Sequence, residues 1–304
     1  MKHHFSPEFY LSGWVGRDGQ LCCIRKVHGK IVAKRRAPGG TGYVHDGYKT
    51  DHIPEADAHR VETAFMSPLD NDAARELRRM LAGDPRIRTS EERSAWTRFV
   101  ISLLFRHPAA VETLKAHFGE MHGIAVEGVQ AENPGTVITL DPAYTSIAAS
   151  NMLTDIIDNT RVGPTIFDMK WVVVDVTASK IPLMTSDRPV VMPLGLGHPD
   201  CHIALPISPT KLFIAAHTDR FKQLRPGQET AVVKAINKAV VVQAQEYVWA
   251  LDDSQLAFIE KHMGTAPERA LMTDEQRQQA IDAARGIKTS RRAPWASHRM
   301  EGRF

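Results

Sequence analysis

A change in periodicity along the chain is the feature that most constrains its fold. Between Pro54 and Leu104 apolar residues recur every three or four positions, which predicts helices with one buried face. From Phe167 to Ala215 the chain turns to short β-rich runs bounded by Pro, Gly and Asp. Because the two patterns are segregated and do not alternate, the sequence predicts an α+β fold. We expect a helical N-terminal half packed on an antiparallel sheet, a meander, from the C-terminal half.

The 304-residue chain is long enough to bury a sizeable core in one domain. We expect a single α+β domain over residues 1–263 that includes a basic hairpin at residues 20–36, with its turn at His28-Gly29. Residues 264–304 are polar and basic, and we expect a partly disordered tail.

Prolines and glycines suggest where the helices end. The helix that contains Leu104 should stop near Pro108, because the residue before a proline disfavours the helical conformation. A further helix is expected to reach Met121, followed by a loop over residues 123–143.

Cysteine usage and hydropathy indicate a reducing compartment. The three cysteines, Cys22, Cys23 and Cys201, lack C-x-x-C spacing, which argues against a disulfide framework and a structural zinc site. The N-terminus lacks an apolar signal-peptide core, and the apolar runs are too short to cross a bilayer. The sequence therefore predicts a cytoplasmic protein without membrane contact.

The net charge of the chain is +3, which is compatible with binding to nucleic acid but does not establish it.

Several spaced motifs occur in a fixed order along the chain. They are His4–Leu11, the isolated Glu62, Arg106-His107-Pro108, Thr185–Val190, Pro206–Pro209 and Asn237. Together they resemble the domain-of-unknown-function family 4238, a family of bacterial and phage proteins, over most of residues 3–250. Ile207 stands where leucine is usual in that family. The resemblance implies no common activity, so it marks positions without giving them roles.

Three of these positions carry side chains that are suited to catalysis: His4, Glu62 and Asp187. A neutral imidazole can act as a general base near pH 7. We expect His4 and Asp187 to approach each other. The alternatives are structural: a leader histidine can pin its segment to the core, and an aspartate before X-Pro commonly forms an Asx turn.

A divalent metal is the cofactor that the sequence leaves open. His59 and Glu62 are three residues apart and share one helix face, so they could supply an imidazole and a carboxylate to a metal ion. Acidic residues are also common at helix starts because of the helix dipole, which is the alternative explanation.

Basic side chains offer candidate contacts to phosphate. Arg25, Lys26, Lys30, Lys34, Arg35 and Arg36 make the hairpin strongly basic. A two-stranded ribbon of this kind fits a major groove, and Lys34, Arg35, Arg36 and the motif residue Arg106 are the predicted phosphate-binding residues. The alternative is that charge on an edge strand protects against aggregation.

Three functional hypotheses follow. The first is a hydrolase acting on nucleic acid or another phosphate-bearing substrate, by analogy a phage-defence or toxin-type effector. The second is a non-catalytic nucleic-acid-binding or regulatory module, and the third is a structural or partner-binding protein. An open cleft that joins His4, Glu62, Arg106 and Asp187 would favour the first, whereas buried and mutually satisfied side chains would favour the third.

Overall fold

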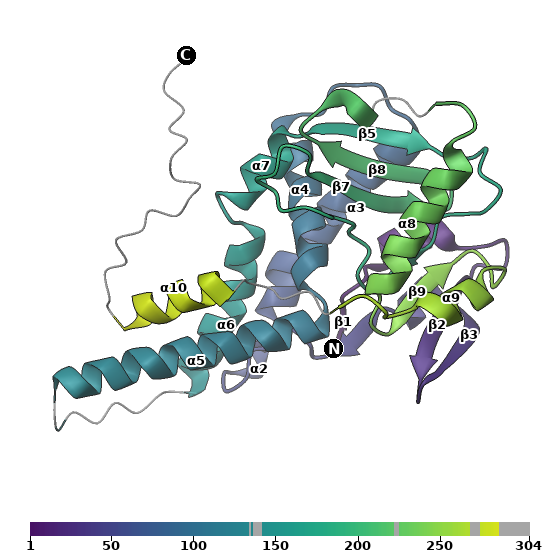
Figure 1. Ribbon diagram of the computed structural model, residues 1–304. Helices are drawn as coiled ribbons and strands as arrows, with labels where there is room; N and C mark the ends of the chain where they lie inside the picture. Colours follow the sequence, from purple (N-terminus) through teal and green to yellow (C-terminus); the bar gives the residue numbers. More distant parts are fainter. Residues whose placement is uncertain (134, 136–141, 222–224, 268–273, 286–304) are drawn as a thin grey trace, which may run out of the picture.

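The computed structural model describes residues 1–133, 135, 142–221, 225–267 and 274–285 (Figure 1). The strands are β1 (Lys2–His4), β2 (Leu21–Val27), β3 (Lys30–Arg36), β4 (Tyr43–His45), β5 (Lys170–Asp175), β6 (Thr185–Ser186), β7 (His202–Ser208), β8 (Lys211–Ala216) and β9 (Tyr247–Ala250). The α-helices are α1 (Glu8–Leu11), α2 (Glu55–Ala58), α3 (Ser67–Leu81), α4 (Ser90–Phe105), α5 (Pro108–Glu132), α6 (Pro142–Ile157), α7 (Val162–Asp168), α8 (Glu229–Gln243), α9 (Leu256–His262) and α10 (Asp274–Ala284). Shorter turns of helix are η1 (Ser12–Trp14), η2 (Pro38–Gly40), η4 (Asp219–Phe221) and the π-helix η3 (Val61–Met66).

The described strands form antiparallel sheets, so the fold is α+β as the sequence predicts. Their orders are β1-β4, β3-β2-β9-β6 and β5-β8-β7. The expected helical N-terminal half is not confirmed, because β1 to β4 all lie within the first 45 residues. The four-stranded sheet takes β2 and β3 from one end of the chain and β6 and β9 from the other, so both halves build it.

The hairpin of β2 and β3 forms as the sequence predicts. Its register runs from Leu21 opposite Arg36 to Val27 opposite Lys30. The two turn residues, His28 and Gly29, both have positive φ, at 48° and 81°. A two-residue turn of this hand matches the right-handed twist of the flanking strands. The hairpin lies at one edge of the molecule, and its turn points away from the body (Figure 1).

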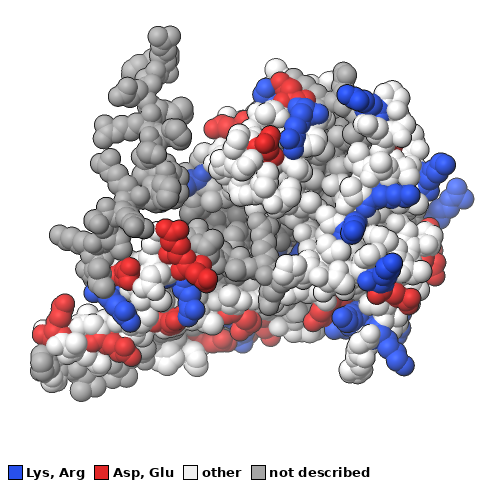
Figure 2. All heavy atoms as spheres, viewed as in Figure 1, with Lys and Arg blue, Asp and Glu red and all other residues white. Residues whose placement is uncertain are grey.

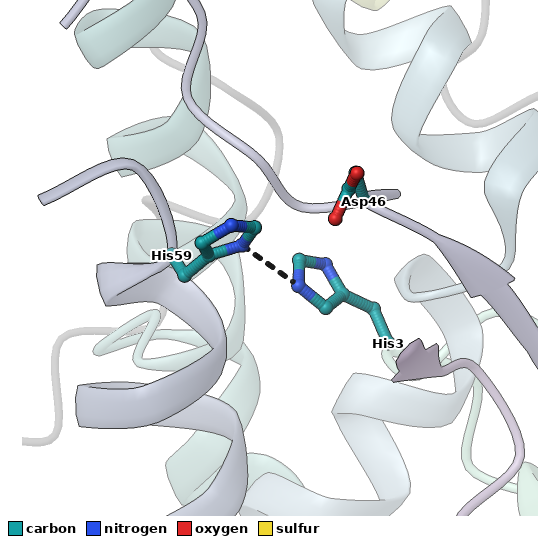
Figure 3. Close-up of side chains that lie close together, drawn as sticks. All are labelled: His3, Asp46 and His59. Atoms are coloured by element: carbon teal, nitrogen blue, oxygen red, sulfur yellow. Dashed lines mark hydrogen bonds between the residues drawn. The ribbon is translucent and has the colours of Figure 1, made fainter. Parts of the chain in front are cut away.

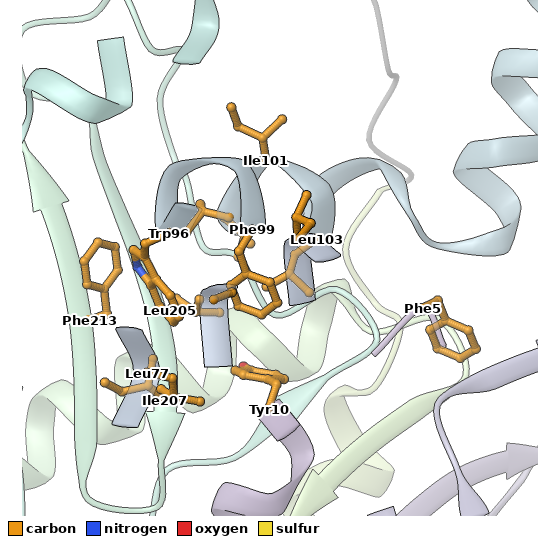
Figure 4. Close-up of a cluster of buried hydrophobic side chains, with 14 of the residues drawn as sticks. Phe5, Tyr10, Leu77, Trp96, Phe99, Ile101, Leu103, Leu205, Ile207 and Phe213 are labelled. Carbon is orange, nitrogen blue, oxygen red and sulfur yellow. The ribbon is translucent and has the colours of Figure 1, made fainter. Parts of the chain in front are cut away.

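The leader at residues 1–16 packs into the main core. Tyr10, Leu11 and Trp14 are each 0% exposed. The indole N–H of Trp14 donates to the carbonyl of Leu183 at 2.8 Å, so the largest leader side chain is both buried and hydrogen-bonded. The ring of Tyr10 lies against Phe99 of α4, with ring centroids 5.9 Å apart (Figure 4). The hydroxyl of Tyr10 also donates to the carbonyl of Pro206 in β7 at 2.8 Å, so the leader is part of the hydrophobic core and contacts both α4 and β7.

Both ends of α4 have a local cause. Thr89 and Glu92 form a capping box in which each side chain accepts a hydrogen bond from the other residue's backbone N–H. The helix ends at Phe105, with Arg106 as its C-cap, just before Pro108 opens α5. The predicted stop near Pro108 is confirmed.

The expected loop over residues 123–143 is wrong for its first part, because α5 continues to Glu132. Gly123 and Gly128 lie within the helix, where a glycine lowers stability without ending the helix. Contacts of α5 with α6 and α10 support this extension. Residues 134 and 136–141 lie outside the described part.

The predicted basic tail from Lys288 onward also lies outside the described residues. Within the described part, no helix is both long and apolar enough to cross a membrane.

Candidate functional site

Arg106 lies at the centre of a buried polar cluster beneath the leader. It is 1% exposed, and its guanidinium donates to both carboxylate oxygens of Asp70, at 2.7 and 3.0 Å. It also donates to the backbone carbonyl of His4 at 2.8 Å, while the hydroxyl of Tyr48 donates to the carbonyl of Arg106 at 2.6 Å. Arg106 therefore connects β1, α3, α4 and the segment after β4, and its guanidinium makes internal contacts away from the surface.

Asp187 is also buried, and several backbone groups hold its carboxylate inside the protein. Its carboxylate accepts hydrogen bonds from the backbone N–H groups of Gln245, Glu246 and Tyr247, at 2.9, 2.6 and 3.0 Å. The imidazole of His107 lies 3.6 Å away, and Asp187 is 2% exposed. These contacts fix the segment that leads into β9, which favours a structural role for this carboxylate.

His4 has different partners from Asp187. Its Nε2 lies 3.5 Å from a carboxylate oxygen of Glu8, and burial lowers the pKa of His4. The neighbouring residue Phe5 stacks edge-on against His107, with ring centroids 5.4 Å apart. The leader therefore reaches the surroundings of Asp187 through Phe5 and His107, and the described contacts do not join His4 to Asp187 directly.

Glu62 lies within the π-helix η3. The hydroxyl of Ser67 donates to its Oε1 at 3.3 Å, and burial raises the pKa of the Glu62 carboxyl. Turns of π-helix are rare and are frequently found at functional sites. Glu62 and Arg106 are close enough for the guanidinium to oppose that rise in pKa. Glu62 thus borders the Arg106 cluster.

A second cluster joins His3, Asp46 and His59 (Figure 3). One ligand atom from each lies within 4.8 Å of the others, and within the described part of the chain this is the group of such side chains that could surround a metal ion. It contains His59 but not Glu62, the partner that the sequence suggested. The Nε2 of His3 and the Nδ1 of His59 are 3.2 Å apart. That distance suits either a shared metal or an N–H···N hydrogen bond.

The hydrogen bonds of the His3 and His59 rings show whether a metal ion or a proton lies between them. The backbone N–H of Tyr48 donates to Nδ1 of His3 at 2.8 Å, so Nδ1 carries the lone pair of the neutral ring and Nε2 carries the proton. Nε2 of His3 then donates to His59, whose own Nε2 donates to Glu55 at 3.2 Å. A metal on His3 would need the imidazolate or the loss of the Tyr48 bond. We therefore assign a proton, and not a metal ion, to the position between Nε2 of His3 and Nδ1 of His59. If zinc stabilised the wild type against unfolding and His3→Asn abolished that effect, the assignment would be wrong.

This chain of hydrogen bonds predicts a pH-dependent stability. Burial is the main cause that lowers the pKa of His3 from its ordinary value of 6.5 to about 4, and nearby His59 lowers it further. The unfolded chain therefore binds a proton more readily than the folded protein between these values. The contribution of neutral His3 to the free energy of unfolding should be complete above pH 6.5. It should be lost as the pH falls toward 4. Urea unfolding of the wild type across this range measures the loss.

Two variants isolate His3 in that measurement. His3→Asn keeps an acceptor for the Tyr48 N–H and cannot be protonated, so its stability should depend less on pH. His45→Asn removes an exposed histidine of β4 and should behave as the wild type does. Equal losses in the wild type and His3→Asn between pH 6.5 and 4 would contradict the assignment to His3.

The predicted phosphate-binding residues of the hairpin divide into two kinds. Arg35 donates to Asp18 and to the backbone carbonyl of Leu251 at 2.7 Å, so it braces the sheet. Lys34 and Arg36 are exposed and make no ion pair with any described residue. Lys and Arg side chains gather over the part of the surface where the hairpin lies (Figure 2). The hairpin thus presents cations that are free to meet an external anion.

Comparison with known proteins identifies a family and no characterised relative. The family model described as "Protein of unknown function (DUF4238)" matches residues 2–254. No curated protein matches, and no solved structure matches.

Proposed function

The chain belongs to the DUF4238 family, and because that family's description specifies no activity, we propose a function from the geometry of the chain: it is a nucleic-acid-binding protein. Its contact surface is the hairpin of β2 and β3. The observation that carries the proposal is a set of four exposed hairpin cations without a described ion-pair partner. They are Lys26, Lys30, Lys34 and Arg36.

The charge of this segment is one-sided in the sequence as well. Residues 19–45 contain six Lys or Arg side chains and no Asp or Glu. The carboxylates that approach the hairpin come from outside it: Glu246 pairs with Arg25 at 3.2 Å, and Asp18 pairs with Arg35. Those two pairs leave the other four cations available. A local excess of this kind attracts a polyanion, and each phosphate contact releases condensed counterions.

Protection of a sheet edge explains only part of this charge. β3 is the edge strand of its sheet, so Lys34 and Arg36 could serve that purpose. β2, however, is an inner strand that pairs with both β3 and β9. The backbone N–H of Lys26 donates to the carbonyl of Glu246 at 3.2 Å, so the exposed Lys26 side chain does not protect a free edge, and binding an external anion gives that residue a role.

Binding is supported better than hydrolysis. His4, Glu62 and Asp187 have separate described partners, and Arg106 and Asp187 are buried and paired. Within the described part of the chain, these four side chains do not form one open catalytic site. Cleavage of the bound nucleic acid stays a prediction, which incubation of a labelled duplex with Mg²⁺ or Mn²⁺ would test.

The binding test compares two variants that lose the same charge. Lys26→Gln, Lys30→Gln and Lys34→Gln are combined in the hairpin variant. Lys180→Gln, Lys234→Gln and Lys238→Gln remove three exposed lysines elsewhere. Fluorescence anisotropy with a labelled duplex should show a roughly 10- to 100-fold weaker affinity for the hairpin variant at about 0.1 M salt, from three lost phosphate contacts. The control variant should bind nearly as the wild type does.

Equal weakening of the two variants would mean that only net charge matters, and it would overturn the hairpin as the contact surface. Unaltered binding by both variants would have the same consequence. Circular dichroism and thermal unfolding of each variant establish that the comparison is made between folded proteins.

A further inference from the structure

The free end of the hairpin is a two-stranded ribbon without a third strand. β9 pairs with β2 from Cys22 to Arg25, where Tyr247 is the last partner. Beyond that point the N–H of Lys26 still donates to the carbonyl of Glu246 at 3.2 Å, and β2 and β3 then continue alone through the pair Val27–Lys30. All side chains of residues 25–30 are exposed. This segment, residues 26–31, is called the ribbon tip below.

The dimensions of the ribbon tip suit one kind of nucleic acid. Two residues at a rise of about 3.4 Å project roughly 7 Å beyond Lys26, where the last backbone bond to the neighbouring segment lies. The major groove of B-form DNA is about 8.5 Å deep and about 12 Å wide, and it admits a two-stranded ribbon. The major groove of an A-form duplex is too narrow for side chains to enter. A B-form duplex therefore fits the ribbon tip, and an A-form duplex does not.

The register places the cations of the tip on opposite faces. Residues directly across an antiparallel pair share a face, and neighbouring residues along a strand alternate. Lys26 shares its face with Ile31, whereas Lys30 shares the other face with Val27. The two ammonium groups thus leave the ribbon in opposite directions. A single strand offers one phosphate backbone, but a groove has a phosphate backbone on each side.

The remaining side chains fit the same arrangement. Lys34 and Arg36 lie four and six residues after Lys30, which places them on the same face of β3, so they continue along one phosphate backbone. Val27 and Val32, on that same face, are 37% and 36% exposed. An exposed apolar group near the turn can contact the methyl group of thymine, which lies in the major groove.

We propose that the ribbon tip inserts into the major groove of B-form DNA, with Lys26 and Lys30 contacting the two opposite phosphate backbones. The proposal rests on the proposed function, because it names the nucleic acid that the hairpin binds and how it binds. The ribbon tip would then recognise double-stranded DNA by the shape of its major groove and by the charge of its phosphates.

Dimethyl sulfate footprinting of the full-length protein on a short DNA duplex tests this geometry. The reagent methylates guanine N7 in the major groove and adenine N3 in the minor groove. At saturating protein, guanine N7 should be protected and adenine N3 should remain reactive. The hairpin variant, at a concentration that restores equal occupancy, should protect guanine N7 less. An RNA duplex of the same sequence should bind roughly tenfold more weakly, since its major groove excludes side chains.

The outcomes separate this proposal from the one on which it rests. Binding that depends on the hairpin lysines, but with adenine N3 protected and guanine N7 reactive, overturns groove insertion and keeps the hairpin as the contact surface. Equal or tighter binding of single-stranded DNA or of the RNA duplex does the same. Absence of binding to every nucleic acid overturns the proposed function itself.

Discussion

A chain that starts at Arg17 is expected not to fold stably. The deletion removes Phe5, Tyr10, Leu11 and Trp14, of which the last three are completely buried. Burial of each such side chain is worth roughly 2–3 kcal/mol, so the loss is about 8–12 kcal/mol. A typical domain has only about 5–15 kcal/mol of stability in total. Circular dichroism and thermal unfolding should show a chain without a cooperative transition, or one with a greatly lowered melting temperature.

Removal of Lys288–Phe304 from the other end is the matched control. That segment is basic and poor in core-forming residues, so its loss should leave the melting temperature nearly unchanged. A leader deletion that melts as the full-length chain does would contradict the packing of residues 1–16 in the core.

Substitution of Arg106 by methionine should produce the largest loss among single charged residues of α4 and its C-cap. Methionine keeps much of the volume but leaves the Asp70 carboxylate and the His4 carbonyl without their donor. Breaking a buried pair by removing one partner costs about 3–5 kcal/mol. Urea unfolding measures the loss, and Asp70→Asn in the Arg106→Met background should recover part of it, because the unpaired charge is then gone.

Arg98 provides the matched control on the same helix. It also forms a two-bond pair, with Asp158 at 2.5 and 3.0 Å, but its side chain is 32% exposed. An exposed pair of this kind contributes about 0–1 kcal/mol, so Arg98→Met should cost little. Equal losses in Arg98→Met and Arg106→Met would refute a special role for the buried cluster.

Local sequence signals were sufficient for the hairpin and for the end of α4. His28-Gly29 supplies the positive φ values that a two-residue turn requires, and Pro108 stops the preceding helix. At its other end α4 begins at Ser90, directly after Thr89, which forms the capping box with Glu92. Each of these features depends on residues only a few positions apart, which is why the sequence could show them.

Features that depend on distant partners were not predictable in the same way. The π-helix η3 has no local signal, and α5, which packs against α6 and α10, continues through two glycines that a local reading takes as breaks. Sheet partners of the hairpin were also hidden, because β9 lies more than 200 residues away in the chain. A strand pair of such long range leaves no periodic trace in either segment alone.

The candidate site shows the same limit. The sequence marked Asp187 and Arg106, but nothing local pointed to their partners His107 and Asp70. The motif marked His4, whereas alternation along β1 places the neighbouring His3 in the interior. A test for strand alternation in the leader could have found that difference. Which side chain faces His59 depends on the tertiary fold.

The hairpin as a nucleic-acid contact is tested most directly by the salt dependence of duplex binding. The four available cations, Lys26, Lys30, Lys34 and Arg36, should give a slope of log Kobs against log salt concentration of about −3.6 for the wild type. The hairpin variant, which keeps only Arg36 of the four, should have a slope near about −0.9, while the Lys180, Lys234 and Lys238 control variant keeps the wild-type slope. Equal slopes for the wild type and the hairpin variant would show that the hairpin is not the contact surface for nucleic acid.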